Sequence, residues 1–254
     1  MSALLAIETS GRSLGVALRD ERGVVFEENV IQGAIHGKAL APITKKALDT
    51  FGLKPRDLAG VAVSLGPGSW TGLRIGLSFA KTLAWAAGIP LLGVSSFEAL
   101  ALEAARNTGL SNGRRARLTL RDARSEGYFI ALFSETLESP QRWIEERVLQ
   151  PAGCIAAVEE ALMAHAQPQL GVTVCGDRVC LDALAEHAQS RGWHLLRHCE
   201  HITGGALAEC GWQRLQHGEG LKSAAQIHEL GPLYLRASDP ELKLSASLAD
   251  KGAK

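Results

Sequence analysis

The chain has 254 residues, of which 46% are hydrophobic and 21% charged, and its 27 basic side chains balance its 27 acidic ones. This composition is ordinary for a globular protein, and the length accommodates one large domain or two lobes with a buried core. Because the net charge is zero, a general electrostatic attraction to nucleic acid or to an anionic membrane is excluded, and any such contact has to be local.

The apolar runs and the cysteines predict a cytoplasmic protein. No apolar run reaches the ~20 residues that span a bilayer, and the first residues lack the basic start and long apolar stretch of a secretion signal. The five cysteines are scattered and show no CxxC spacing. Reduced thiols in a cytoplasm fit this pattern.

The first hundred residues predict a mixed sheet with helices on its faces. Segments 4–9, 14–19 and 24–30 alternate or run apolar and are joined by short turns, as in an antiparallel meander. Apolar residues at helical spacing predict a helix over 38–51, which Gly52 ends. A strand at 61–65, a helix at 71–87 and a strand at 91–94 come next, and this β-α-β order favours helices packed on a sheet.

The polar run 107–113 is the predicted boundary between two lobes, since it follows a helix that ends near residue 106. Beyond it we expect strands at 116–120, 128–133, 143–149, 172–175 and 193–199, and helices at 154–165, 181–191 and 206–216. The predicted organisation is therefore a first lobe over 1–106, a smaller second lobe over 107–238 and a polar C-terminal tail over 239–254.

The most specific segment is the glycine-rich turn before helix 71–87, which reads GPGSWTGLRIG over residues 66–76. Its signature positions are Gly66, Pro67, Gly68, Ser69, Thr71, Gly72 and Arg74. Together with AIETS at 6–10, LGVSS at 92–96, DAR at 122–124 and PLYLR at 232–236, this turn resembles the TsaB (YeaZ) family of the actin-like, sugar-kinase-type superfamily.

The resemblance implies an α/β fold of two actin-like (ribonuclease H-like) lobes, with mixed five-stranded sheets and flanking helices. It also implies a non-catalytic subunit that supports a TsaD-type transferase in forming N6-threonylcarbamoyladenosine at position 37 of tRNA. A small ATPase, TsaE, would complete the assembly, and the chain would form a homodimer when alone. Because Asp122 and Glu126 are four positions apart where the family has five, no role is carried over to Glu126 or Tyr128.

The helix predicted at 71–87 has two apolar stripes, whereas a surface helix needs only one to cover its core. One stripe consists of Leu73, Leu77, Ala80 and Ala84, and the other of Ile75, Phe79, Leu83 and Ala86. We expect this helix and the preceding one to form a partner interface, which we assign to Leu40, Ile43, Leu73, Gly76, Leu77, Ala80 and Ala84. A fully buried internal helix is the alternative. The Gly-Pro-Gly turn would fix the direction in which the helix leaves the sheet.

A nucleotide site is the next candidate, because helix N-termini attract phosphate. Glu8 and Ser10, at the end of the first strand, would be its residues, and Gly204–Gly205 is the one glycine pair that could supply a second phosphate loop. No lysine stands in the glycine-rich turn as it would in a nucleotide-gripping loop. We therefore expect no cofactor, and weak binding of ATP or ADP stays open.

Catalytic and metal sites find little support in the sequence. The HxxxH pair His194 and His198 falls on a predicted strand, where residues four apart lie ~13 Å from each other. We expect no metal site and no catalytic residues. A nucleotide-dependent phosphotransferase or ATPase of the same fold, and a metallohydrolase of the "glycoprotease" type, are the alternative functions.

A cluster of arginines could grip the phosphates of an RNA. It consists of Arg114, Arg115, Arg117, Arg121 and Arg124. An auxiliary contact to tRNA is one interpretation, and a solvated edge strand is the other.

Overall fold

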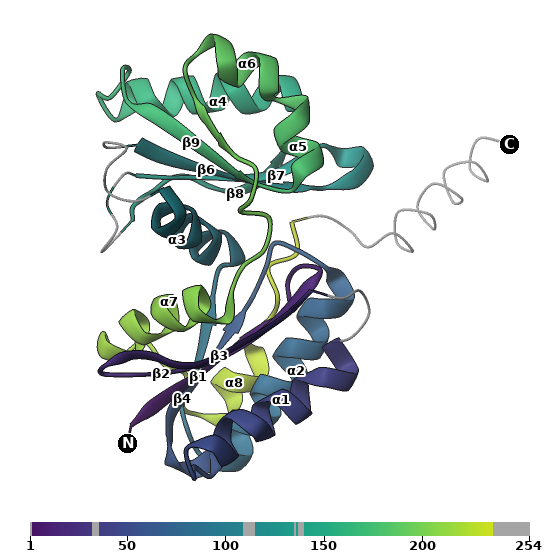
Figure 1. Ribbon diagram of the computed structural model, residues 1–254, viewed down its shortest axis with the longest axis vertical. Coiled ribbons are helices and arrows are strands. Elements are labelled where there is room, and N and C mark those ends of the chain that lie inside the picture. Colours follow the sequence, from purple (N-terminus) through teal and green to yellow (C-terminus); the bar gives the residue numbers. More distant parts are fainter. Residues whose placement is uncertain (1, 32–35, 109–114, 135, 137–139, 236–254) are drawn as a thin grey trace, which may run out of the picture.

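The computed structural model describes residues 2–31, 36–108, 115–134, 136 and 140–235, and it shows two lobes built on the same plan (Figure 1). Each lobe contains a five-stranded sheet, ordered β3-β2-β1-β4-β5 in the first and β8-β7-β6-β9-β10 in the second. In both sheets the first three strands in the chain form an antiparallel meander, and the last two run parallel to the first. The predicted α/β class with two mixed five-stranded sheets is confirmed.

The strands of the first sheet are β1 (Ala3–Glu8), β2 (Ser13–Asp20), β3 (Gly23–Ile31), β4 (Leu58–Ser64) and β5 (Leu91–Val94). Those of the second are β6 (Arg115–Asp122), β7 (Tyr128–Phe133), β8 (Arg142–Leu149), β9 (Gly171–Gly176) and β10 (His194–Leu196). β1 is buried on both faces, which explains its uninterrupted apolar sequence.

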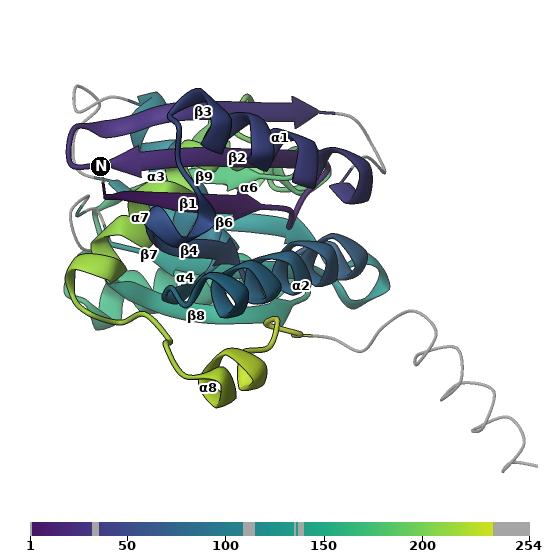
Figure 2. The same ribbon diagram turned by 90° about the horizontal axis from the view of Figure 1, so that it is seen from below.

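Helices cover both faces of each sheet. On the outer face of the first sheet, α1 (His36–Thr50) lies over β2 and β3, and α2 (Trp70–Ala87) lies over β4, as Figure 2 shows. Between the two sheets lie α3 (Ser96–Thr108) and α7 (Gly204–Gln216) (Figure 1). The outer face of the second sheet carries α4 (Pro151–Ala164), α5 (Arg178–Ala183) and α6 (Ala185–Ser190).

The chain returns to the first lobe after residue 203, and this corrects the predicted second lobe over 107–238. Helix α7 packs on β1, β2 and β4 because Leu207, Ala208 and Trp212 cover the inner apolar face of that sheet. Leu221 then pairs with Leu91, and the short helix α8 (Ala224–Glu229) packs against α2. The second lobe is thus an insertion, and the predicted tail over 239–254 lies outside the described residues.

Other differences from the predicted elements are local. The helix expected over 181–191 is divided at Leu184, whose ψ of 0° leaves the helical range, into α5 and α6. The strand expected over 193–199 is reduced to β10, and α8 was not predicted.

Candidate partner surface and inter-lobe cleft

The glycine-rich turn between β4 and α2 lies against the turn between β1 and β2. Ser69 is the N-cap of α2: its hydroxyl accepts a hydrogen bond from the Gly72 amide at 3.2 Å. The Ser69 amide donates to the carbonyl oxygen of Ser10 at 2.7 Å. The turn therefore joins the start of α2 directly to the end of β1.

Three glycines, four residues apart, allow this close approach. A Cβ atom on Gly68 would lie 2.2 Å from the Ser10 carbonyl oxygen, and one on Gly72 would lie 2.1 Å from the Thr9 carbonyl oxygen. A Cβ on Gly76 would lie 2.1 Å from the Thr9 hydroxyl oxygen. The spacing of these glycines thus places one side of α2 on the chain's own β1–β2 turn.

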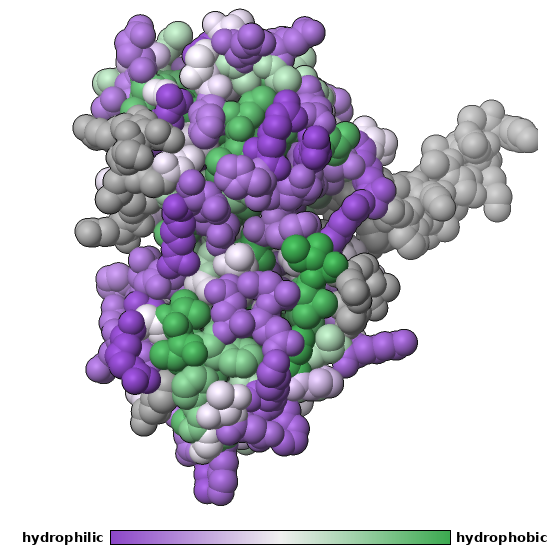
Figure 3. Space-filling model, viewed as in Figure 1, coloured by the Kyte–Doolittle hydropathy of each residue, from purple (hydrophilic) through white to green (hydrophobic). Residues whose placement is uncertain are grey.

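The seven residues predicted to form the partner interface are buried within this chain. They are Leu40, Ile43, Leu73, Gly76, Leu77, Ala80 and Ala84. The prediction chose the wrong stripe of α2, because this stripe is the one that covers the sheet. Away from the sheet, Ile75, Phe79 and Leu83 are only partly buried, and Trp85, at a different position around the helix, has 66% of its surface exposed. In the space-filling view of Figure 3, apolar side chains show on the surface of both lobes among polar ones.

A strap formed by residues 220–235 borders α2 on its other flank. The Tyr234 ring stacks on Trp70, with 3.8 Å between ring centroids, and the Arg74 Nε donates to the Tyr234 hydroxyl at 3.0 Å. The Leu233 amide donates to the Leu65 carbonyl oxygen at 2.7 Å. This role of the signature residue Arg74 was not predicted, since its partner lies 160 positions away in the chain.

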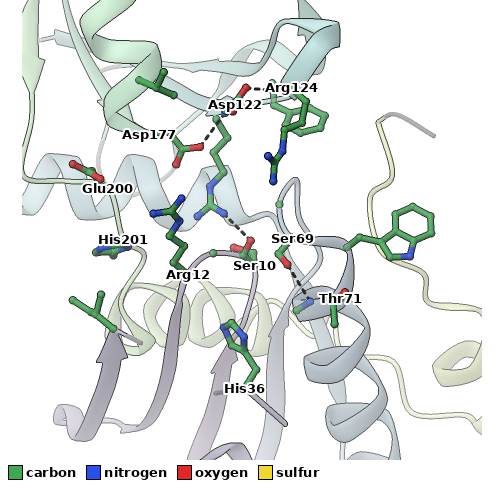
Figure 4. Close-up of a pocket in the computed structure, with 18 of the residues that line it drawn as sticks. Ser10, Arg12, His36, Ser69, Thr71, Asp122, Arg124, Asp177, Glu200 and His201 are labelled. Carbon is green, nitrogen blue, oxygen red and sulfur yellow. Dashed lines mark hydrogen bonds between the residues drawn. The ribbon is translucent and has the colours of Figure 1, made fainter. Parts of the chain in front are cut away.

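A cleft of about 1010 Å³ separates the two lobes (Figure 4). Ser10, Ser69 and Thr71 line it from the first lobe, while Arg124 and Asp177 line it from the second. Apolar side chains, among them Trp70, Phe129 and Val179, line the cleft together with these polar ones.

Charges of both signs face this cleft. Asp177 accepts a hydrogen bond from the Asp122 amide at 2.9 Å, and Asp122 accepts one from the Arg124 amide at 2.8 Å. These two carboxylates hold the turn after β6. The guanidinium groups of Arg12 and Arg124 have no hydrogen bond or ion pair with the described part of the chain.

Glu8 lies below the cleft floor and is fully buried. Its Oε1 accepts hydrogen bonds from both the amide and the hydroxyl of Ser10. Burial raises the pKa of the Glu8 carboxyl above its ordinary value of 4.5, and the nearby charge of Arg121 and the Ser10 hydrogen bonds oppose this rise. Of the two residues predicted for a weak nucleotide site, Ser10 lines the cleft and Glu8 is enclosed beneath it.

The glycine pair predicted as a second phosphate loop has its amides occupied. The Gly204 amide donates to the Asn29 side-chain oxygen, and the Gly205 amide donates to Glu27 Oε1, both at 2.9 Å. Side chains of β3 thus satisfy these donors at the N-terminus of α7. A carboxylate stands where a phosphate would have to bind.

The arginines predicted as one RNA-binding cluster do not share one surface. Arg117 and Arg121 are buried, and Arg117 donates to the Ser134 and Thr136 carbonyl oxygens. Arg124 lines the cleft, and Arg114 lies outside the described residues. Arg117 and Arg121 are therefore ruled out as part of an exposed RNA-binding face, because the middle of β6 is covered on both faces.

Glu126 and Tyr128, which follow the DAR segment, both have buried polar groups. Glu126 ends the short 3-10 helix Arg124–Glu126, and one of its carboxylate oxygens is buried without a hydrogen bond. Burial raises the pKa of the Tyr128 phenol, which lies at the start of β7.

Within the described ranges, no three His, Cys, Asp or Glu side chains form a group that could hold a metal ion, and no helix could cross a membrane.

Comparison with known proteins gives one family. The family model of TsaD, tRNA N6-adenosine threonylcarbamoyltransferase, matches residues 23–173. The chain is 28% identical over 248 residues to the tRNA threonylcarbamoyladenosine biosynthesis protein TsaB of Bacillus subtilis (strain 168), a match that covers 94% of this chain and 96% of the relative. It is 35% identical over 106 residues to TsaB of Escherichia coli (strain K12), covering 42% of this chain and 46% of that protein.

A solved structure agrees with this match. YeaZ from Pseudomonas aeruginosa superposes with a TM-score of 0.71 at 23% identity, over 92% of this chain and all of that one. The likeness shows a common fold, and the predicted two-lobed arrangement is confirmed.

Proposed function

The chain belongs to the family of TsaD, tRNA N6-adenosine threonylcarbamoyltransferase, and from this premise we propose its function. We propose that it is a non-catalytic subunit in the formation of N6-threonylcarbamoyladenosine in tRNA. The similarity to TsaB of Bacillus subtilis over nearly the full length of both chains supports this role. The partner would be a TsaD-type transferase subunit, bound as a heterodimer.

The outward side of α2 carries the proposal. Trp85 is two-thirds exposed near the end of this helix, and its neighbours one turn earlier are Lys81 and the exposed Thr82. Exposed small residues, Ser78 and Thr82, lie on the same side and allow another helix to approach closely. A large exposed aromatic side chain with small neighbours is typical of the residues that contribute most to a protein interface.

The residues predicted for a nucleotide site favour a supporting role over a catalytic one. Superfamily nucleotide sites need donors and an acidic group that face the ligand. Here Gly204 and Gly205 donate to β3 side chains, and Glu8 accepts hydrogen bonds from Ser10. Both elements serve the chain's own packing. Weak binding of ATP or ADP at the cleft stays a secondary proposal.

The remaining partners belong to the same proposal. The α2 surface would pair two copies of this chain in the absence of the transferase, and a TsaE-like ATPase would join the heterodimer. The assembly would work in the cytoplasm, and an auxiliary contact to tRNA would use Arg12 and Arg124, which reach the cleft from both lobes.

Co-expression with the TsaD-like protein of the same genome, followed by size-exclusion chromatography, tests the proposal. We expect the two wild-type chains to elute together and Trp85→Ala to weaken their association at least ~30-fold, which corresponds to a loss of ~2 kcal/mol. Met163→Ala is the matched control, since Met163 is 69% exposed on α4 of the second lobe.

Two results would count against the proposal. Separate elution of the wild-type chains would remove the proposed function itself. Equal affinities for the two variants would remove α2 as the interface and leave the partnership to be placed elsewhere.

A further inference from the structure

The carbonyl oxygen of Ser10 is a meeting point of the two lobes and α2. It accepts one hydrogen bond from Nη1 of Arg121 at 2.8 Å and another from the Ser69 amide at 2.7 Å. Arg121 belongs to β6 of the second lobe, and Ser69 is the N-cap of α2. One backbone oxygen thus connects the second lobe to the start of the helix that carries the proposed partner surface.

Arg121 is held firmly at this point. It is only 5% exposed, and its guanidinium lies so near the backbone that a Cβ on Gly11 would be 3.3 Å from Nη2. Its charge also acts on the buried carboxylate of Glu8. Withdrawing Arg121 would remove a positive charge that opposes the effect of burial on Glu8, and the pKa of that carboxyl would rise further.

The first turn of α2 must move when the turn between β1 and β2 moves, because the two are in close contact. Gly68 and Gly72 lie so close to Ser10 and Thr9 that no Cβ atom fits between them. A displacement of the Ser10 carbonyl would therefore move the first turn of α2 with it. Because packed elements shift between discrete arrangements rather than bend continuously, such a movement extends along the helix.

We propose that Arg121 is a positioning residue that couples the orientation of the second lobe to the placement of α2, and thereby sets the affinity of the partner surface. This inference rests on the proposed function, because it names how the same surface is regulated. By thermodynamic reciprocity, binding of the transferase partner at α2 would favour the lobe arrangement in which Arg121 contacts Ser10.

Two buried arginines on one strand provide the test. Arg121→Met removes the contact between the lobes, and Arg117→Met removes an arginine that is 6% exposed and donates to Ser134 and Thr136 of its own lobe. We would measure the affinity for the TsaD-like partner, the thermal unfolding midpoint, and hydrogen exchange of amides 69–75. We expect Arg121→Met to weaken partner binding about tenfold, the effect of one lost charge-assisted hydrogen bond, and to speed exchange at 69–75.

The control should lose thermal stability without either change. The double variant Glu8→Gln with Arg121→Met removes the buried carboxyl along with the arginine. We expect it to regain stability and to keep the weakened affinity, so the test does not depend on the single variant folding well.

The outcomes separate this inference from the proposed function. If Trp85→Ala weakens the complex while Arg121→Met in either background binds like Arg117→Met, the coupling is wrong and the partner surface stands. If Trp85→Ala has no effect, the α2 surface itself is wrong, whatever the arginine variants do.

Discussion

The two lobes share one strand order but differ in the helices that follow the equivalent strands. In the first lobe, β4 leads into α2, a single helix of 18 residues, whereas in the second the equivalent strand β9 leads into α5 and α6, of 6 residues each. Both junctions depend on a glycine packed against a carbonyl oxygen at the end of the central strand. Gly68 meets Ser10 in the first lobe, and Gly176 meets Leu120 in the second.

The difference between the lobes lies in the residues beyond that first glycine. In the first lobe Gly72 and Gly76 continue the close approach for two further turns, so α2 lies flat on the sheet and presents an outward side. The second lobe has no such continuation: Asp177 caps the turn toward Asp122, and Val179 of α5 lines the cleft. The same topology therefore yields a long helix face in one lobe and a cleft wall in the other.

The largest expected losses of stability come from substituting the closely packed glycines, and they test whether such a glycine is equally important in both lobes. A Cβ on Gly176 would lie 1.8 Å from the Leu120 carbonyl oxygen and would also have to adopt a φ of +131°, so we expect Gly176→Ala to cost ~3 kcal/mol or more. Gly72→Ala should cost ~3 kcal/mol through its clash with the Thr9 carbonyl. Urea denaturation measures both.

Gly153 in α4 provides the control, because its surroundings leave open space for a Cβ. Gly153→Ala should be neutral or stabilise by up to ~1 kcal/mol. A loss below ~1 kcal/mol in either of the two other variants would show that the close contact relaxes easily, and the comparison between the lobes would fail at that junction.

A smaller effect should appear in the pH dependence, and it concerns only the first lobe. Burial raises the folded-state pKa of Glu8 above 4.5, so the folded chain holds a proton that the unfolded chain releases. The stability that this proton supplies is complete below the unfolded pKa and is lost as pH rises through the folded pKa. Glu8→Gln should remove this loss.

Unfolding free energies of the wild type and of Glu8→Gln, measured from about pH 4 to about pH 8, check the sign. We expect the variant to gain on the wild type as pH rises. A constant difference between the two would mean that Arg121 and Ser10 fully compensate for burial of the carboxylate.

The smallest expected loss of stability concerns the strap of residues 220–235, which packs along α2 in the first lobe. Tyr234→Phe keeps the stack on Trp70 and loses the hydrogen bond from Arg74, which should cost ~0.5 kcal/mol at this partly exposed site. Tyr234→Ala loses the stack as well and should cost ~1.5 kcal/mol. Thermal unfolding of the two variants separates the contributions, and equal midpoints would show that the stack contributes nothing.

Periodicity in the sequence was sufficient to predict most strands and the two apolar stripes of α2, because both patterns are local. It could not say which stripe faces the sheet, since both are apolar. The structure shows the reason: the buried stripe includes Gly76, Ala80 and Ala84, small residues that let the helix lie close, while the bulkier Phe79 and Leu83 point to the rim.

Long-range contacts were the part that local patterns could not predict. Arg117 and Arg121 looked like surface residues because arginine is seldom buried, but each finds carbonyl oxygens on segments distant in the chain. The predicted use of Gly204 and Gly205 failed for the same reason, since their partners Asn29 and Glu27 are about 175 positions away.

The return of the chain to the first lobe also has a consequence for synthesis. The inner face of the first sheet, with Leu4, Ala6 and Ala62, is covered by α7, whose residues come after the entire second lobe. On a ribosome, α1 and α2 emerge early and can cover the outer face, while the inner face waits for about a hundred more residues to be translated. A nascent chain stopped before residue 204 therefore exposes an apolar sheet surface, and we expect it to need a chaperone until the final segment arrives.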